Sequence, residues 1–122
     1  MFAFQTHHLV KRYGSTAALN GLNMNVPKGS IYGFLGLNGA GKTTTFCVAA
    51  QFVHASSGTF TIQGQLGMLP QDARFYHGRS VVSQLKFFGL LSGVESQDID
   101  REVKRVLELV GLADKGKSAV QK

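Results

Sequence analysis

The 122 residues, of which 43% are hydrophobic and 16% charged, can bury enough apolar surface for one folded domain, which excludes a disordered chain. Fifteen glycines follow no fixed period, which excludes collagen-like and simple repeat proteins. Thirteen basic and seven acidic residues give a net charge of +6, but the basic residues are dispersed, so we expect no nucleic-acid partner.

Two strands are predicted at the start of the chain. Residues 3–13 mix aromatic, β-branched and polar residues, which is typical of a strand. Residues 17–26 alternate at their end, where Leu22, Met24 and Val26 share one face and asparagines occupy the other. This period of two predicts a strand with one buried face.

A strand, a glycine-rich loop and a helix are predicted next. Residues 31–35 form a short apolar run, which favours a strand covered on both faces, as in a parallel sheet. Residues 36–41 are too rich in glycine for regular structure. From Lys42 a helical pattern runs as far as the Ser-Ser-Gly at 56–58, with an apolar face made of Phe46, Ala49, Ala50 and Val53.

Short strands are predicted at 59–62 and 65–69, followed by a loop over 71–79. Ser80 is a suitable N-cap for a helix that carries an apolar stripe over residues 81–91.

The last helix has the clearest pattern. We expect Ser96 to cap it, Asp98 and Asp100 to lie in its first turn, and Gly111 to end it. Charged residues occupy one face, and the opposite face is a stripe of Ile99, Val103, Val106, Leu107 and Val110.

Residues 36–43 match the phosphate-binding pattern GxxxxGK[ST] in full. Glycines allow the backbone to point successive N–H groups at phosphate oxygens, and the start of a helix adds its positive dipole end. We expect Lys42 to bridge the terminal phosphates and the Thr43 hydroxyl to ligate Mg²⁺. The predicted nucleoside triphosphate site comprises Gly36, Asn38, Gly39, Ala40, Gly41, Lys42, Thr43 and Thr44.

The run from Ile31 to Thr45 resembles the Walker A segment of ABC transporter ATP-binding subunits, especially those of bacterial-type exporters of drugs, antibiotics and polysaccharides. The resemblance implies an α/β P-loop NTPase fold, with an N-terminal antiparallel β part and the start of a helical subdomain. It also implies that Tyr13 is the A-loop aromatic that stacks on adenine. Gln71 matches the Q-loop glutamine, which contacts Mg²⁺ and water.

In this interpretation residues 1–122 are an incomplete nucleotide-binding domain. They divide into an ATP-binding core (1–70), a Q-loop (71–79) and the start of the helical subdomain (80–122). The signature motif, the Walker B strand with its catalytic glutamate and the switch histidine have no counterpart in the sequence, so we expect an incomplete family domain. Three origins stay open, namely a fragment, a truncated gene product, or half of an assembly that another copy completes. Lys42 and Gln71 can then position phosphates and water without forming a complete catalytic site. We predict weak Mg-ATP binding without efficient hydrolysis, and whether the chain is an enzyme stays open.

The family resemblance implies a membrane-spanning transporter subunit and a second ATP-binding subunit in a head-to-tail dimer as partners. It places the chain in the cytoplasm, peripheral to the membrane, where ATP would be coupled to export. Phe75, Tyr76, Phe87 and Phe88 are the candidates for partner contact if they are exposed. Two alternatives remain, namely another P-loop enzyme such as a small kinase, and a non-catalytic, degenerate nucleotide-binding or interaction protein.

Cys47 is the only cysteine, which excludes an intrachain disulfide and a cysteine-based zinc site, and we expect its side chain to pack. The four histidines share no ligand spacing, so structural or solvated roles are expected for them. No stretch approaches the roughly 18 uninterrupted apolar residues of a membrane helix. We therefore expect a soluble chain with no direct membrane insertion.

Overall fold

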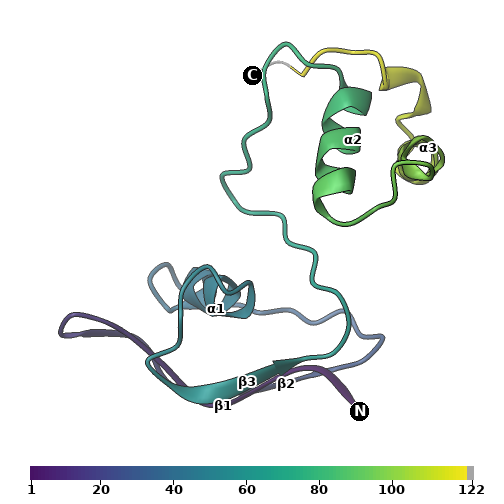
Figure 1. Ribbon diagram of the computed structural model, residues 1–122. Coiled ribbons are helices and arrows are strands. Elements are labelled where there is room, and N and C mark those ends of the chain that lie inside the picture. The colour runs from purple at the N-terminus through teal and green to yellow at the C-terminus, as the bar shows by residue number, and fades with distance from the viewer. Residues whose placement is uncertain (121–122) are drawn as a thin grey trace. The chain divides into compact units, whose positions relative to one another are not determined.

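The computed structural model describes residues 1–120, so the last two residues of the predicted 80–122 segment lie outside it. The chain forms two compact units, Met1–Leu69 and a second that begins at Pro70. Figure 1 shows the strands and the first helix in one unit and two further helices in the other. Each unit has its own buried apolar cluster.

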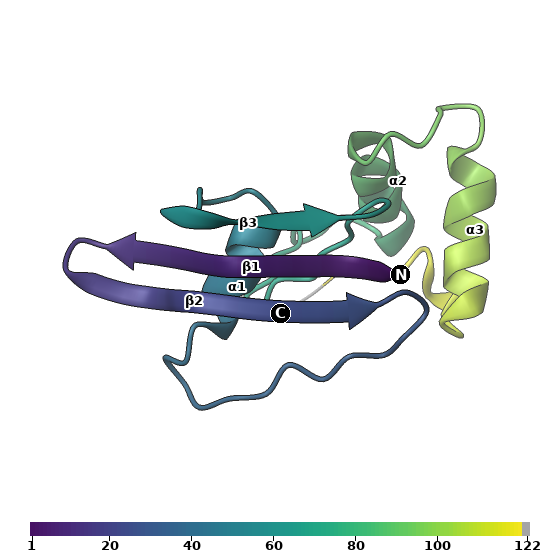
Figure 2. The same ribbon diagram turned by 90° about the horizontal axis from the view of Figure 1, so that it is seen from below.

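The first unit is built on a three-stranded antiparallel sheet. It comprises β1 (Phe2–Tyr13), β2 (Thr16–Pro27) and β3 (Ser57–Ile62) in the order β2-β1-β3 (Figure 2). The strands predicted at 3–13, 17–26 and 59–62 are confirmed. The alternation of β2 is confirmed too, since Met24 is buried while Asn23 and Asn25 are exposed.

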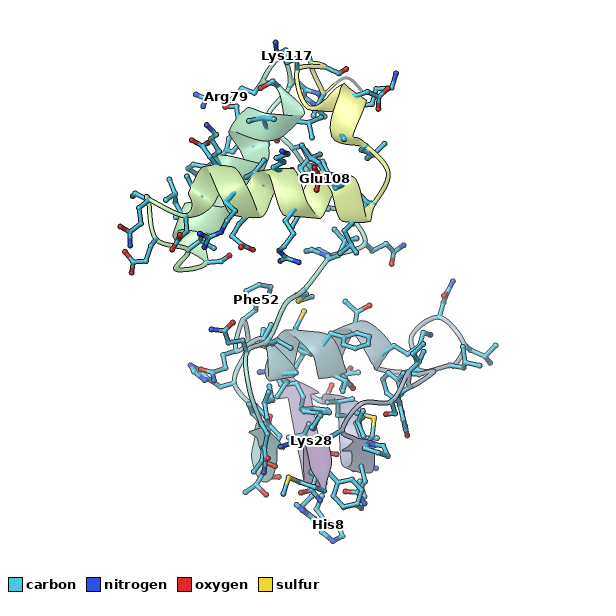
Figure 3. The ribbon with its side chains drawn as sticks, turned by 90° about the vertical axis from the view of Figure 1, so that its right-hand side faces the viewer. His8, Lys28, Phe52, Arg79, Glu108 and Lys117 are labelled. Carbon is cyan, nitrogen blue, oxygen red and sulfur yellow. The ribbon has the colours of Figure 1, made fainter. Side chains whose placement is uncertain are left out.

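β1 contains a bulge at His7 and His8, where its register shifts against both neighbouring strands. His8 adopts a left-handed backbone conformation with φ of 47°. The side-chain oxygen of Asn23 accepts the His8 N–H at 2.8 Å, which satisfies a donor that the interrupted ladder leaves free. In Figure 3 the labelled His8 lies beyond the sheet on the side away from the helix. The bulge thus has a structural role.

Helix α1 (Lys42–Ala49) packs against one face of this sheet (Figure 3). Val48 joins Leu9 and Leu19 in the buried cluster. The predicted face is partly wrong, because Phe46 is 49% exposed and the buried side chains are Thr45, Val48 and Ala49. The helix also ends earlier than predicted, since Gln51 turns the backbone to φ of 59°. Val53 therefore lies beyond the helix.

Neither of the two central strands expected at 31–35 and 65–69 forms. Ile31, Leu35 and Leu69 are largely exposed. Strand structure requires a hydrogen-bonded neighbour, and within residues 1–120 no strand pairs with either segment. The predicted antiparallel part of the fold is present, whereas the expected parallel pairing is absent from the described residues.

The second unit contains α2 (Val81–Leu91), α3 (Ile99–Leu109) and a short 3₁₀ turn, η1 (Ala113–Lys115). The predicted cap of α2 is confirmed, because the Ser80 hydroxyl accepts the Ser83 N–H at 3.1 Å. The stretch at 71–79 is a loop, as predicted. No helix of the described residues is long and apolar enough to cross a membrane.

The apolar stripe of α3 is confirmed at its centre, where Ile99, Val103 and Leu107 are buried against α2. The predicted cap is wrong, because Asp98 rather than Ser96 occupies the N-cap position. The cause is a turn ahead of the helix, in which the Asp98 N–H donates to the Glu95 carbonyl at 2.9 Å. Residues 96–98 are part of that turn, so the helix starts at Ile99.

Candidate functional site

The glycine-rich loop over 36–41 curls tightly and ends on the first turn of α1. The Ala40 N–H donates to the Leu37 carbonyl at 3.1 Å, which closes the loop. Gly41 is the N-cap of α1 and has a left-handed φ of 93°. Its carbonyl accepts both the N–H of Thr45 at 2.9 Å and the Thr45 hydroxyl at 3.0 Å. The loop is therefore joined rigidly to the helix that follows.

Gly41 also rests directly on β2. A Cβ atom built at Gly41 would lie 2.5 Å from the carbonyl oxygen of Ala18 and 2.8 Å from Cδ2 of Leu19. The clash with the Ala18 backbone cannot be relieved by a side-chain rotation, so glycine is favoured by contact as well as by φ. This contact places the loop against one end of the sheet.

The side chain of Lys42 folds back over the loop that precedes it. Its ammonium group, Nζ, donates to the carbonyls of Gly36 at 2.6 Å and Leu37 at 2.7 Å. A Cβ on Gly36 would lie 3.8 Å from the same Nζ and 3.3 Å from Cβ of Ala40. The positive charge is thus held on the inner side of the loop.

The donor set of the loop suits an anion. Within the described chain, no backbone carbonyl accepts the N–H groups of Asn38, Gly39, Gly41, Lys42 and Thr43. Free amides at a helix N-terminus carry partial positive charge, and the Lys42 ammonium adds a full one. Thr43 is exposed in the first turn of α1, so its hydroxyl can serve as a cation ligand. These groups fit the phosphates of a nucleoside triphosphate together with Mg²⁺.

Tyr13 lies at the end of β1 and is 51% exposed. The ammonium of Lys11 lies over its ring, 4.9 Å from the centroid, and also donates to the carbonyl of His54 at 2.8 Å. Lys11 pairs across the sheet with Leu19, the residue that Gly41 contacts. Tyr13 and the loop therefore belong to the same end of the sheet. Sequence reasoning missed Lys11, although strand alternation places it on the same face as Tyr13.

Gln71 lies in the second unit, exposed, in a turn directly after Pro70. The strand predicted to lead into it is absent. The loop residues and Gln71 belong to different units, so the role of Gln71 at the phosphates stays a prediction.

The four aromatic side chains singled out for partner contact are all exposed. They form one cluster, in which neighbouring rings meet edge to face with centroids 5.4–6.4 Å apart. We call this cluster, which consists of Phe75, Tyr76, Phe87 and Phe88, the aromatic patch. Arg79 extends over the Tyr76 ring at 5.9 Å. Gln84, which is buried, binds the backbone of Tyr76 and was not anticipated, because nothing in the pattern of α2 distinguishes it from Ser83 or Lys86.

The remaining polar candidates do not form a metal site. In the part of the chain that the structure describes, no group of three or more histidine, cysteine, aspartate or glutamate residues could hold a metal ion. Cys47 is half-buried on α1, in agreement with the packing role expected for it.

Comparison with known proteins identifies the chain by sequence. The profile of the family described as ABC transporter matches residues 19–122. The bacitracin transport ATP-binding protein BcrA of Enterococcus faecalis is 33% identical over 123 residues, which cover 91% of this chain and 39% of that protein. The linearmycin resistance ATP-binding protein LnrL of Bacillus subtilis is 29% identical over 129 residues, covering 96% of this chain and 42% of that protein.

The chain thus spans about two fifths of the length of these curated relatives. In structure it is similar to cbiO1 of Clostridium perfringens, described as part of the ABC transporter complex cbiONQ. The TM-score is 0.79 at 21% identity, and the match covers 97% of this chain and 54% of that one. A family match over most of the chain and a loop that fits phosphates lead to one conclusion: this chain belongs to the ABC transporter family, as part of its ATP-binding domain.

Proposed function

We propose that the chain is the N-terminal part of the ATPase subunit of an exporter and that it binds Mg-ATP through residues 36–43. The observation that carries the proposal is the loop itself, in which the Lys42 ammonium is held on the loop and the amides of Asn38, Gly39, Gly41, Lys42 and Thr43 have no backbone acceptor. Such a donor set stabilises the negative charge of phosphate oxygens. The relatives named for bacitracin transport and linearmycin resistance support an export role.

Each residue of the proposed site has a distinct task. The free amides of Asn38, Gly39 and Gly41 donate to phosphate oxygens, and Ala40 closes the loop through its bond to Leu37. Lys42 exchanges its bonds to the carbonyls of Gly36 and Leu37 for bonds to phosphate. Thr43 would hold Mg²⁺, and Gln71 is a further candidate ligand. Thr44, the next residue of α1, is a candidate contact for the nucleotide. Bound Mg²⁺ neutralises part of the phosphate charge. Tyr13 receives the adenine base by stacking.

We propose binding without efficient hydrolysis by the 122-residue chain. Residues 36–43 contain no carboxylate and no histidine, so the loop has no group that could take a proton from an attacking water. Positioning and charge stabilisation remain, and these are the part of phosphoryl transfer that a phosphate loop supplies.

Lys42→Ala tests the binding proposal, and Lys28→Ala is a matched control, since Lys28 is an exposed lysine of the same unit. Calorimetric titration with Mg-ATP is expected to show at least about tenfold weaker binding for Lys42→Ala, from the loss of a charge-assisted contact. Lys28→Ala should bind like the unmodified chain. Equal affinity of all three proteins would refute the proposal, and steady ATP hydrolysis that Lys42→Ala abolishes would refute the absence of turnover.

We also propose that the aromatic patch contacts a membrane-spanning subunit, so that the chain works at the cytoplasmic side of a membrane together with a second ATP-binding subunit. Contiguous exposed aromatic side chains are enriched at protein interfaces and are rare on monomer surfaces without a role. A Phe87→Ser/Phe88→Ser variant of the intact transporter subunit should lose co-purification with its membrane subunit. Leu109→Ser, which changes an exposed apolar residue of α3, should retain it. Co-purification of both variants would argue against this surface.

A further inference from the structure

We propose that Lys11 is a positioning residue for Tyr13: it covers one face of the ring and holds the other face ready for a nucleobase. The inference rests on the proposed function, because it assumes that the site takes a nucleotide whose base stacks on Tyr13. It adds a residue outside the phosphate loop that contributes to affinity for the base alone.

The geometry of β1 brings the two side chains together. Lys11 and Tyr13 are two residues apart on one strand, and side chains at this spacing share a face of the sheet. The Lys11 ammonium lies 4.9 Å from the ring centroid. A cation within about 6 Å of a tyrosine ring is attracted by the negative charge of its face. One face of Tyr13 is therefore occupied.

A second contact fixes the ammonium in this place. Lys11 Nζ donates to the carbonyl of His54 at 2.8 Å. The segment that carries His54 is itself attached to β1, because the Ser56 N–H donates to the Val10 carbonyl at 2.8 Å and the Ser56 hydroxyl accepts the Arg12 N–H at 2.9 Å. Lys11 thus sits between a fixed backbone carbonyl and the ring.

Fixing the conformation of the Tyr13 ring matters because Tyr13 is half exposed at the end of a strand. A ring that is free to change rotamer loses entropy when a base stacks on it, and a ring already held in place loses less. The base would use the ring face opposite the ammonium. A planar nucleobase is the chemical class that such a face accepts, since stacking requires a π surface and no hydrogen-bond pattern.

The cross-strand register connects this pair with the phosphate loop. Lys11 pairs with Leu19, and Gly41 of the loop lies against Leu19 and the carbonyl of Ala18. A ligand whose phosphates lie in the loop therefore has the Tyr13 end of the sheet beside it. Lys11 itself is engaged by the ring and by His54, so we assign it to the base and not to the phosphates.

The test compares Mg-ATP with Mg-tripolyphosphate, which offers the phosphates without a base. Titrations are made on the unmodified chain, Lys11→Met, Lys11→Arg and the control Lys28→Met. Loss of an exposed cation–π contact should weaken ATP binding of Lys11→Met about two- to fivefold. Tripolyphosphate binding should be unchanged, and Lys11→Arg should restore ATP affinity because a guanidinium can also lie over the ring.

Unchanged ATP affinity of Lys11→Met would overturn this inference alone, and so would an equal loss for both ligands, which indicates general damage to the site. An unmodified chain that binds neither ligand would overturn the proposed function and the inference with it. NMR of ¹³C-lysine-labelled chain gives a readout that does not depend on nucleotide. The Lys11 side-chain protons next to Nζ should be shifted upfield by the ring current and should lose this shift in Tyr13→Leu. No such shift would contradict the contact.

Discussion

The side-chain amide of Gln84 makes two hydrogen bonds to the backbone of Tyr76, accepting its N–H at 2.9 Å and donating to its carbonyl at 3.1 Å. Gln84 is only 4% exposed, and these two bonds satisfy both polar groups of its buried side-chain amide. A residue of α2 thereby holds the loop that precedes the helix, together with the ring of Tyr76 in the aromatic patch.

Gln84→Leu should lower the stability of the second unit. It removes both hydrogen bonds to the Tyr76 backbone, and each intramolecular hydrogen bond contributes about 0.5–1.5 kcal/mol. Urea denaturation measures the loss, and hydrogen exchange should show a faster Tyr76 amide. Gln97→Leu, at an exposed position before α3, is the control and should leave both unchanged. A stable Gln84→Leu variant with a slowly exchanging Tyr76 amide would show that the two hydrogen bonds from Gln84 do not hold this loop.

The variants Gly41→Ala and Gly39→Ala should differ in stability, although both glycines have a positive φ, 93° at Gly41 and 82° at Gly39. Alanine at either position is strained by about 1–2 kcal/mol. Only at Gly41 does the added Cβ also overlap the carbonyl of Ala18, whereas nothing lies within 4 Å at Gly39. Gly41→Ala should therefore destabilise the first unit more than Gly39→Ala in thermal unfolding. Equal melting temperatures would show that the loop does not rest on β2.

Tyr13→Ala should weaken binding of Mg-ATP, because the base loses its stacking surface. Stacking contributes roughly 1–3 kcal/mol, so a loss of about tenfold or more is expected. Tyr13→Phe keeps the ring and should restore binding, as measured with a panel of nucleotides. If Tyr13→Ala binds ATP as tightly as Tyr13→Phe does, Tyr13 has no role in base binding. Another class of P-loop enzyme then becomes the better hypothesis.

Leu107→Ala and Leu109→Ala compare the two faces of α3. Leu107 is 6% exposed and packs against α2, whereas Leu109, two residues further on, is 76% exposed. Truncation of a buried leucine costs about 2–5 kcal/mol, but an exposed position changes stability by less than about 0.5 kcal/mol. Denaturant titration followed by circular dichroism provides the measurement. Similar effects at both positions would mean that the stripe does not form the core of this unit.

Local patterns predicted those elements whose structure depends on near neighbours in sequence. The alternation of β2, the Ser80 cap and the stripe of α3 are each set by residues within a few positions of one another. The strand predicted for the apolar run 31–35 does not form, because apolar composition alone does not supply a hydrogen-bonding neighbour. The predicted N-cap role of Ser96 is wrong because serine favours turns as well as caps, and Ser96 lies in a turn.

The sequence by itself determined the family resemblance and the phosphate-binding motif, because eight consecutive residues match the pattern GxxxxGK[ST]. Only the tertiary structure decided that Gly41 rests on Ala18, that Lys11 covers Tyr13 from an anchor on His54, and that Gln84 holds Tyr76. These contacts depend on strand register, on the end of α1 and on the path of a loop. Such features arise when separate elements pack, and no local pattern of residues specifies them.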